Sequence, residues 1–136
     1  MLIVLGMLRQ IGELESIGDS CFNLARILRR KYENKVVFNE ALTAGVDGMF
    51  TLVEEALTQM NVLLAGRREE SDIAASREIE YRINASRNIY KQQNIENLDA
   101  HAYGYDIGTV FSDIIRECEK TGDYIINVAE ARMGID

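Results

Sequence analysis

Proline is absent from all 136 residues of this chain, and only 10 of them are glycine. Proline interrupts an α-helix because it lacks the backbone donor and its ring clashes with the preceding turn. The chain is also rich in Ala, Leu, Glu and Arg, which favour helices. No segment has the strict alternation of apolar and polar residues that a strand needs. These features predict an all-α fold.

Apolar residues recur at spacings of three and four in four segments, which is the pattern of amphipathic helices. We expect helices over about residues 2–32, 42–65, 71–93 and 105–133. Gly66 offers a left-handed stop after the second helix, and the last connection falls within residues 94–104. The third helix has a thin apolar stripe, so we expect it at an edge or against a partner. Long helices with short connections predict an antiparallel bundle of about four.

Composition narrows the classes of protein that fit. A length of 136 residues with 47% apolar and 27% charged residues suits one globular domain. The net charge of -7 argues against binding to nucleic acid or an anionic membrane. The longest apolar run, residues 2–8, is far shorter than the ~20 residues that cross a bilayer, so we expect a cytoplasmic segment without direct membrane insertion. Cys21 and Cys118 are expected to be buried thiols in a reducing compartment.

Two distant segments repeat one pattern. Residues 13–25 and 117–129 are identical at six of thirteen aligned positions, with the shared pattern Glu-x-Glu-x-x-Gly-Asp-x-x-x-Asn-x-Ala. Two unrelated amphipathic helices would share apolar positions but not this set of polar residues. We interpret the first and last helices as two copies of one design.

Helical geometry predicts where the acidic residues of the repeat lie. An advance of about 100° per residue places Glu15 and Asp19 on one flank of the apolar stripe. Glu119 and Asp123 fall on the corresponding flank of the last helix. Glu80 takes the same position in the third helix, with Asn84 one turn later. Three helices could therefore present polar pairs at the rim of the core.

The repeat carries two features that destabilise an isolated helix. Like charges at i and i+4 cost about 0.2–0.5 kcal/mol per pair, and a glycine within a helix costs about 1 kcal/mol relative to alanine. Their recurrence indicates close helix approach at Gly18 and Gly122, or a bound cation. The alternative is a solvated acidic face with glycines that only permit tight packing. Glu13 and Glu117 are predicted to point towards water.

The segment Glu15-Ser-Ile-Gly-Asp19 resembles the Leu-Glu-Arg-Ile-Gly-Asp segment of the PhoU family, and residues 119–123 form a second copy. Residues 42–134 resemble one complete three-helix PhoU repeat, and residues 1–33 resemble the last helix of a preceding repeat. Together, residues 1–136 resemble a single domain. It is most similar to the C-terminal PhoU-like domain of bacterial sodium–phosphate cotransporter family proteins, so we expect a fragment of a longer protein.

The resemblance implies a regulatory domain that modulates phosphate uptake through protein contacts at the cytosolic face of the inner membrane. It implies two partners, namely the membrane transporter portion of the parent protein and further copies in a homo-oligomer. It also implies multinuclear iron or zinc, or another divalent cation, held by acidic residues. The matching positions are Glu15, Asp19, Glu119, Asp123 and Glu80. In the third helix, Asn84 replaces the acid that the family pattern expects.

Two other classes of protein fit parts of the sequence. A metal-free helical dimerisation or interaction module, unrelated to transport, would have the same helices and acidic flanks. A metal-dependent helical enzyme is disfavoured because a di-iron bundle needs Glu-x-x-His motifs. The single histidine, His101, lies in the predicted break between the third and fourth helices. No nucleophile or glycine-rich phosphate loop accompanies the acids, so we expect no enzymatic activity.

Overall fold

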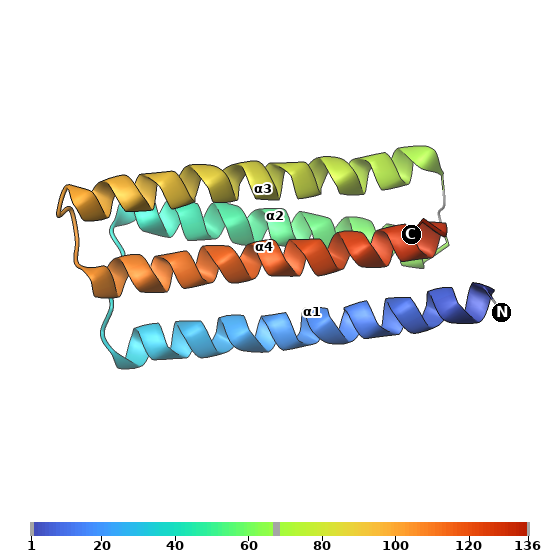
Figure 1. The fold of residues 1–136 in the computed structure, drawn as a ribbon, viewed down its shortest axis with the longest axis horizontal. Helices are drawn as coiled ribbons and strands as arrows, with labels where there is room; N and C mark the ends of the chain where they lie inside the picture. The colour runs from blue at the N-terminus through green and yellow to red at the C-terminus, as the bar shows by residue number, and fades with distance from the viewer. Residues whose placement is uncertain (1, 67–68, 136) are drawn as a thin grey trace.

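The computed structural model describes residues 2–66 and 69–135, and within that part it contains four α-helices and no strand. They are α1 (Leu2–Glu33), α2 (Glu40–Leu64), α3 (Glu70–Asp99) and α4 (Tyr105–Met133). Successive helices run in opposite directions, so that α1 and α4 are also antiparallel (Figure 1). The predicted all-α antiparallel bundle is confirmed.

Local side-chain chemistry fixes several helix ends. The Asn39 side chain caps α2 because its Oδ1 accepts a hydrogen bond from the Leu42 backbone N–H at 2.9 Å. At the start of α3, Asp72 Oδ2 accepts from the backbone N–H of Glu69 at 3.2 Å. Gly66 follows α2 with φ of +117°, and Gly134 caps α4 with φ of +77°. These left-handed conformations strain side chains other than glycine, so the predicted stop after α2 lies at the expected residue.

Helix α3 extends to Asp99, six residues beyond its predicted end at residue 93. The polar residue Asn94 lies inside the protein and explains the difference. Its Nδ2 donates to the Gly108 carbonyl at 3.0 Å, and its Oδ1 accepts from the Tyr103 hydroxyl at 2.5 Å. Asn94 therefore ties the end of α3 to the start of α4, although by composition it resembles a loop residue.

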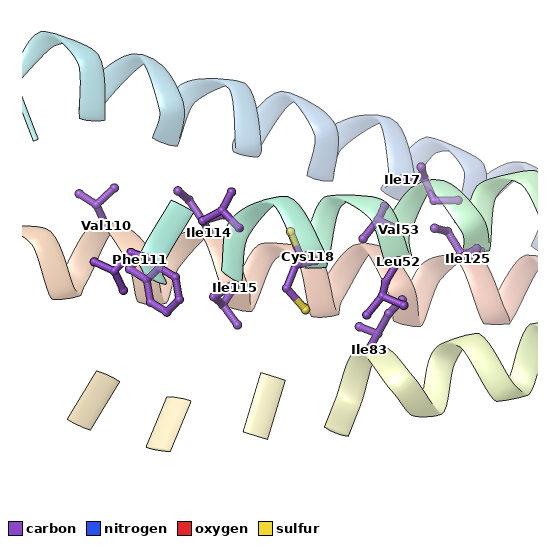
Figure 2. Packing of buried hydrophobic residues seen from close by; sticks show 14 of the residues in the cluster. Ile17, Leu52, Val53, Ile83, Val110, Phe111, Ile114, Ile115, Cys118 and Ile125 are labelled. Carbon is purple, nitrogen blue, oxygen red and sulfur yellow. The ribbon is translucent and has the colours of Figure 1, made fainter. Parts of the chain in front are cut away.

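The core lies mainly among α2, α3 and α4. Figure 2 shows Leu52 and Val53 of α2, Ile83 of α3 and a row of α4 side chains that point towards one another. Fully enclosed members include Met49 and Ile114, each with 0% of its surface exposed. Burial of one such side chain contributes about 1.5–3 kcal/mol. These three helices form a complete bundle in which each helix packs against the other two.

Helix α1 packs against α4 alone among the described helices. In Figure 1, α4 lies between α1 and α3. Ile17 joins the core cluster from α1, but many apolar residues of α1 remain exposed. No helix within residues 2–66 and 69–135 has the length and hydrophobicity required to cross a bilayer.

The two cysteines lie in different environments. Cys118 is buried and Cys21 is exposed, and both are free thiols. The prediction of two buried thiols is therefore correct for Cys118 and wrong for Cys21. Burial, together with the nearby Glu117 and Cys21, raises the pKa of Cys118 to about 12. The Cys118 thiol is therefore neutral at physiological pH.

Candidate functional site

The two copies of the repeat pack against each other along the seam between α1 and α4. Asn127 Nδ2 donates to Glu13 Oε2 at 3.3 Å, so the last polar position of one copy meets the first of the other. The equivalent pair, Asn23 and Glu117, lines one cleft at the other end of the seam. The polar ends of the pattern thus lie along the contact between its own two copies.

Buried hydrogen bonds hold the middle of this seam. Ser20 Oγ donates to Glu117 Oε2 at 2.6 Å and lies 2.6 Å from Thr121 Oγ1. Ser20, Glu117 and Thr121 are all buried, and Glu13 is half-buried. The prediction that Glu13 and Glu117 point towards water is therefore wrong. The reason is that α1 packs into the bundle through a face that combines Glu13 and Ser20 with the apolar Ile17, Leu24 and Ile27, beside the predicted apolar stripe.

In the α4 copy, the acidic flank lies against α3. Glu119 forms an ion pair with Arg87 of α3. Asp123 shares a hydrogen bond with Glu80, whose Oε1 also accepts from Asn84 Nδ2 at 2.7 Å. Three predicted ligands are therefore brought together, and we name Glu80, Glu119 and Asp123 the α3–α4 carboxylate cluster.

Partial burial and the neighbouring carboxylates raise the pKa of Asp123 in this cluster. The pKa of Asp123 is raised from 3.8 to about 6, although the residue keeps contact with solvent. Partial burial is the largest cause, followed by the charges of Glu119 and Glu80 and the hydrogen bond to Glu80, while Arg87 acts in the opposite direction. Below that pH, protonated Asp123 can donate to the Glu80 carboxylate. The cluster contains three acids and only Arg87 as a basic partner, so its formal charge is negative.

Gly122 allows α3 to approach α4 closely. A Cβ at Gly122 would lie 3.1 Å from Cδ1 of Ile83, which is tighter than an ordinary contact. At the equivalent Gly18 of α1, a Cβ would meet nothing within 4 Å. The interpretation of the glycines as points of helix approach holds for Gly122, whereas Gly18 faces open space.

The remaining predicted ligands, Glu15 and Asp19, lie exposed on α1. The five acids are therefore divided between two places, with Glu80, Glu119 and Asp123 together and Glu15 and Asp19 apart. Within the described residues, no group of three or more His, Cys, Asp or Glu side chains has an arrangement that could hold a metal ion. Because Arg87 pairs with Glu119, the carboxylates available to a hard cation are Glu80 and Asp123, whose oxygens are hydrogen-bonded to each other and, for Glu80, to Asn84.

Several apolar and small residues of α1 and α4 that differ by 104 in residue number have opposite exposure. On α4 these residues are buried, namely Ile115, Cys118, Gly122, Ile125, Ile126 and Ala129. On α1 their equivalents are all exposed, and we name them the α1 open face: Ile11, Leu14, Gly18, Cys21, Phe22 and Ala25. Phe22 is 65% exposed, whereas its equivalent Ile126 is 8% exposed. The face that α2 and α3 cover on α4 is thus uncovered on α1.

Sequence reasoning missed Arg87, the cation of the carboxylate cluster. A signal was present, because Arg87 follows Glu80 by seven residues and so lies on the same face of α3.

Comparison of this chain with models of protein families, with curated proteins and with solved structures finds no match.

Proposed function

We propose that this chain is a PhoU-like regulatory domain of a sodium–phosphate cotransporter family protein and that it modulates phosphate uptake through protein contacts. The repeated Glu-x-Glu-x-x-Gly-Asp pattern and its resemblance to the PhoU motif support the phosphate assignment. One observation carries the contact mechanism, which is that the repeat is covered on α4 and open on α1. A regulator of this kind needs a docking face rather than catalytic groups.

The proposed occupant of the α1 open face is a helical hairpin of the parent protein with the chemistry of α2 and α3. The α4 copy supports this choice because it illustrates what covers the same pattern. Ile83 packs at Gly122, and Arg87 pairs with Glu119. The occupant would accordingly place a branched apolar side chain at Gly18 and a basic one at Glu15. Burial of a large apolar side chain such as Phe22 would favour docking by about 1.5–3 kcal/mol.

The test is phosphate uptake by cells that carry the parent protein with Phe22→Asp. Tyr81→Asp is the matched control, because Tyr81 is a 71% exposed aromatic residue on α3, outside the open face. We expect altered regulation of labelled-phosphate uptake for Phe22→Asp and normal regulation for Tyr81→Asp. Equal behaviour of both variants would contradict the proposal. A second possibility is that another copy of this chain occupies the α1 open face. Sedimentation of the purified chain tests it, because the chain would then form a concentration-dependent dimer that Phe22→Asp abolishes.

A divalent cation held by Glu80 and Asp123 is the second element of the proposal. It would replace the proton that these carboxylates share. In melting experiments above pH 7, Mn²⁺ should raise the melting temperature of the wild type and leave that of Asp123→Asn unchanged. A cation at 100 times its dissociation constant would stabilise the chain by about 2.7 kcal/mol.

A metal-free interaction module, unrelated to transport, is the second candidate function. The ion pair between Arg87 and Glu119 favours it, because an internal cation already neutralises one acid of the cluster. This candidate predicts no effect of Mn²⁺ on either protein and no effect of Phe22→Asp on phosphate uptake. The same two experiments therefore separate the candidates.

A further inference from the structure

A cleft of about 500 Å³ lies between the C-terminal half of α1 and the N-terminal half of α4. Five basic side chains from the two helices line it, namely Arg26, Arg29, Arg30, Arg116 and Lys120. They are five of the 15 lysines and arginines in a chain whose net charge is -7. One third of the positive charge of an acidic protein is thus gathered in a single hollow.

The acidic residues of the cleft do not neutralise its five basic side chains. Three of them, Glu33, Asp113 and Glu117, line it, so its formal charge is +2. Asp113 accepts hydrogen bonds from Arg30 Nη2 at 3.1 Å and from Arg116 Nη2 at 2.9 Å. A single half-buried carboxylate therefore holds one guanidinium of each helix at the cleft. Glu117 is buried, accepts a hydrogen bond from Ser20 of the seam, and lies 4.0 Å from Lys120 Nζ through its Oε2.

The helix dipole does not account for this arrangement. A cation in the last turn of a helix offsets the negative helix end, and Arg30 occupies that turn of α1. The effect fades within one turn, yet Arg26 lies farther from the helix end, and Arg116 and Lys120 belong to α4. Arg26 makes none of the described ion pairs and lies over the Phe22 ring, with its guanidinium carbon 5.9 Å from the ring centre.

We propose that this cleft binds a small anion with two or more linked phosphoryl groups. Guanidinium forks bind phosphate oxygens through paired hydrogen bonds, and several forks from two helices suit several phosphoryl groups. A volume of about 500 Å³ is of the size of small-molecule sites. The overall charge of -7 repels long polyanions and anionic membranes. Inorganic polyphosphates and the phosphate tail of a nucleotide share the required chemistry, and binding of either needs no partner at the α1 open face.

Calorimetric titration of the whole chain with inorganic pyrophosphate at low ionic strength tests this site. We expect saturable binding that is at least about tenfold tighter than that of orthophosphate. Arg26→Gln and Arg116→Gln should each weaken it about tenfold. Arg77→Gln, which removes the same charge from an exposed position on α3, should leave it unchanged. Circular dichroism confirms that each variant is folded.

A variant that binds pyrophosphate more tightly provides a further test, because a misfolded variant would bind it more weakly. Glu33→Gln removes an exposed carboxylate from the cleft and should tighten pyrophosphate binding about threefold. Glu78→Gln makes the same change on α3, where the side chain is 63% exposed, and should have no effect. Tighter binding of ADP than of pyrophosphate would identify a nucleotide as the source, and tighter binding of tripolyphosphate would identify an inorganic chain. Absence of saturable binding, or equal effects of the cleft variants and their controls, would overturn the proposal.

Discussion

Helices α1 and α4 carry the same residue pattern and have opposite environments. The α4 copy contacts α1, α2 and α3, whereas the α1 copy contacts α4 alone. Glu119 is paired with Arg87, and the equivalent Glu15 is exposed. The comparison teaches that the pattern specifies two faces, one for its own copy and one for a helical hairpin. In this chain only α4 has both faces filled, so equal substitutions at equivalent positions should have unequal effects.

The largest difference is expected for Ile115→Ala and Ile11→Ala, which remove the same atoms from equivalent positions. Ile115 is 3% exposed and Ile11 is 58% exposed. We expect a loss of about 2–5 kcal/mol in the free energy of unfolding for Ile115→Ala, because it opens a cavity. Ile11→Ala should change stability by no more than about 0.5 kcal/mol. Urea denaturation at low protein concentration measures both, and equal losses would mean that the α1 open face is already covered.

The second comparison concerns the two glycines. Gly122→Leu would force a side chain against Ile83, which already lies within 3.1 Å of a Cβ at this position. We expect a destabilisation of about 1–3 kcal/mol from overpacking. Gly18→Leu meets open space and replaces a poor helix former by a good one, so it should stabilise the isolated chain by up to about 1 kcal/mol. A loss of stability in both variants would contradict the difference in helix approach.

A smaller effect is expected at the seam that the two copies share. Ser20→Ala removes the hydroxyl that donates to Glu117 Oε2 at 2.6 Å and leaves a buried carboxylate oxygen without that donor. We expect a loss of about 1–2 kcal/mol. Ser16→Ala is the matched control, because Ser16 Oγ bonds only the Gly12 carbonyl of its own helix in an exposed position. If thermal melting gives equal losses for the two variants, the buried network does not stabilise the seam.

The sequence predicts the helices well because apolar periodicity, caps and glycine stops are local properties. The sequence also predicted that Glu80 of α3 and the pair Glu119 and Asp123 of α4 lie at the rim of the core, and the fold brings these three together. Periodicity defines which face of a helix is apolar but not which neighbour covers it. Cys21 lies on the predicted stripe of α1 and is nevertheless exposed.

Polar residues with buried partners were the second source of error. Glu117 was predicted to be solvated, because no sequence pattern reveals that Ser20, almost a hundred residues away, would donate to it. Asn94 was assigned to a connection for the same reason, although its partners Gly108 and Tyr103 hold it inside the bundle. Both residues depend on contacts between distant segments. Composition and spacing within one segment cannot supply that information.

The smallest effect should be a dependence of stability on pH that arises at Asp123. Its pKa is about 6 in the folded protein against an ordinary value of 3.8, so the folded state binds this proton more tightly than the unfolded state. Its contribution to stability is therefore complete below about pH 4, declines as the pH rises, and is lost above about pH 6. Asp123→Asn keeps a neutral donor to Glu80 at every pH. The variant should consequently gain stability over the wild type between about pH 4 and 6 and keep that advantage at higher pH.

Urea denaturation at several pH values measures the difference between the wild type and Asp123→Asn. Asp19→Asn is the matched control, because it removes one carboxylate from the equivalent position of the uncovered copy. The pH-dependent change in the free energy of unfolding for Asp19→Asn is subtracted from that for Asp123→Asn, so that effects common to the loss of any one carboxylate are removed. A difference that stays constant from pH 4 to pH 7 would show that the pKa of Asp123 is not raised in the folded protein. The covered and uncovered copies of the repeat would then differ in packing alone and not in the protonation of their acids.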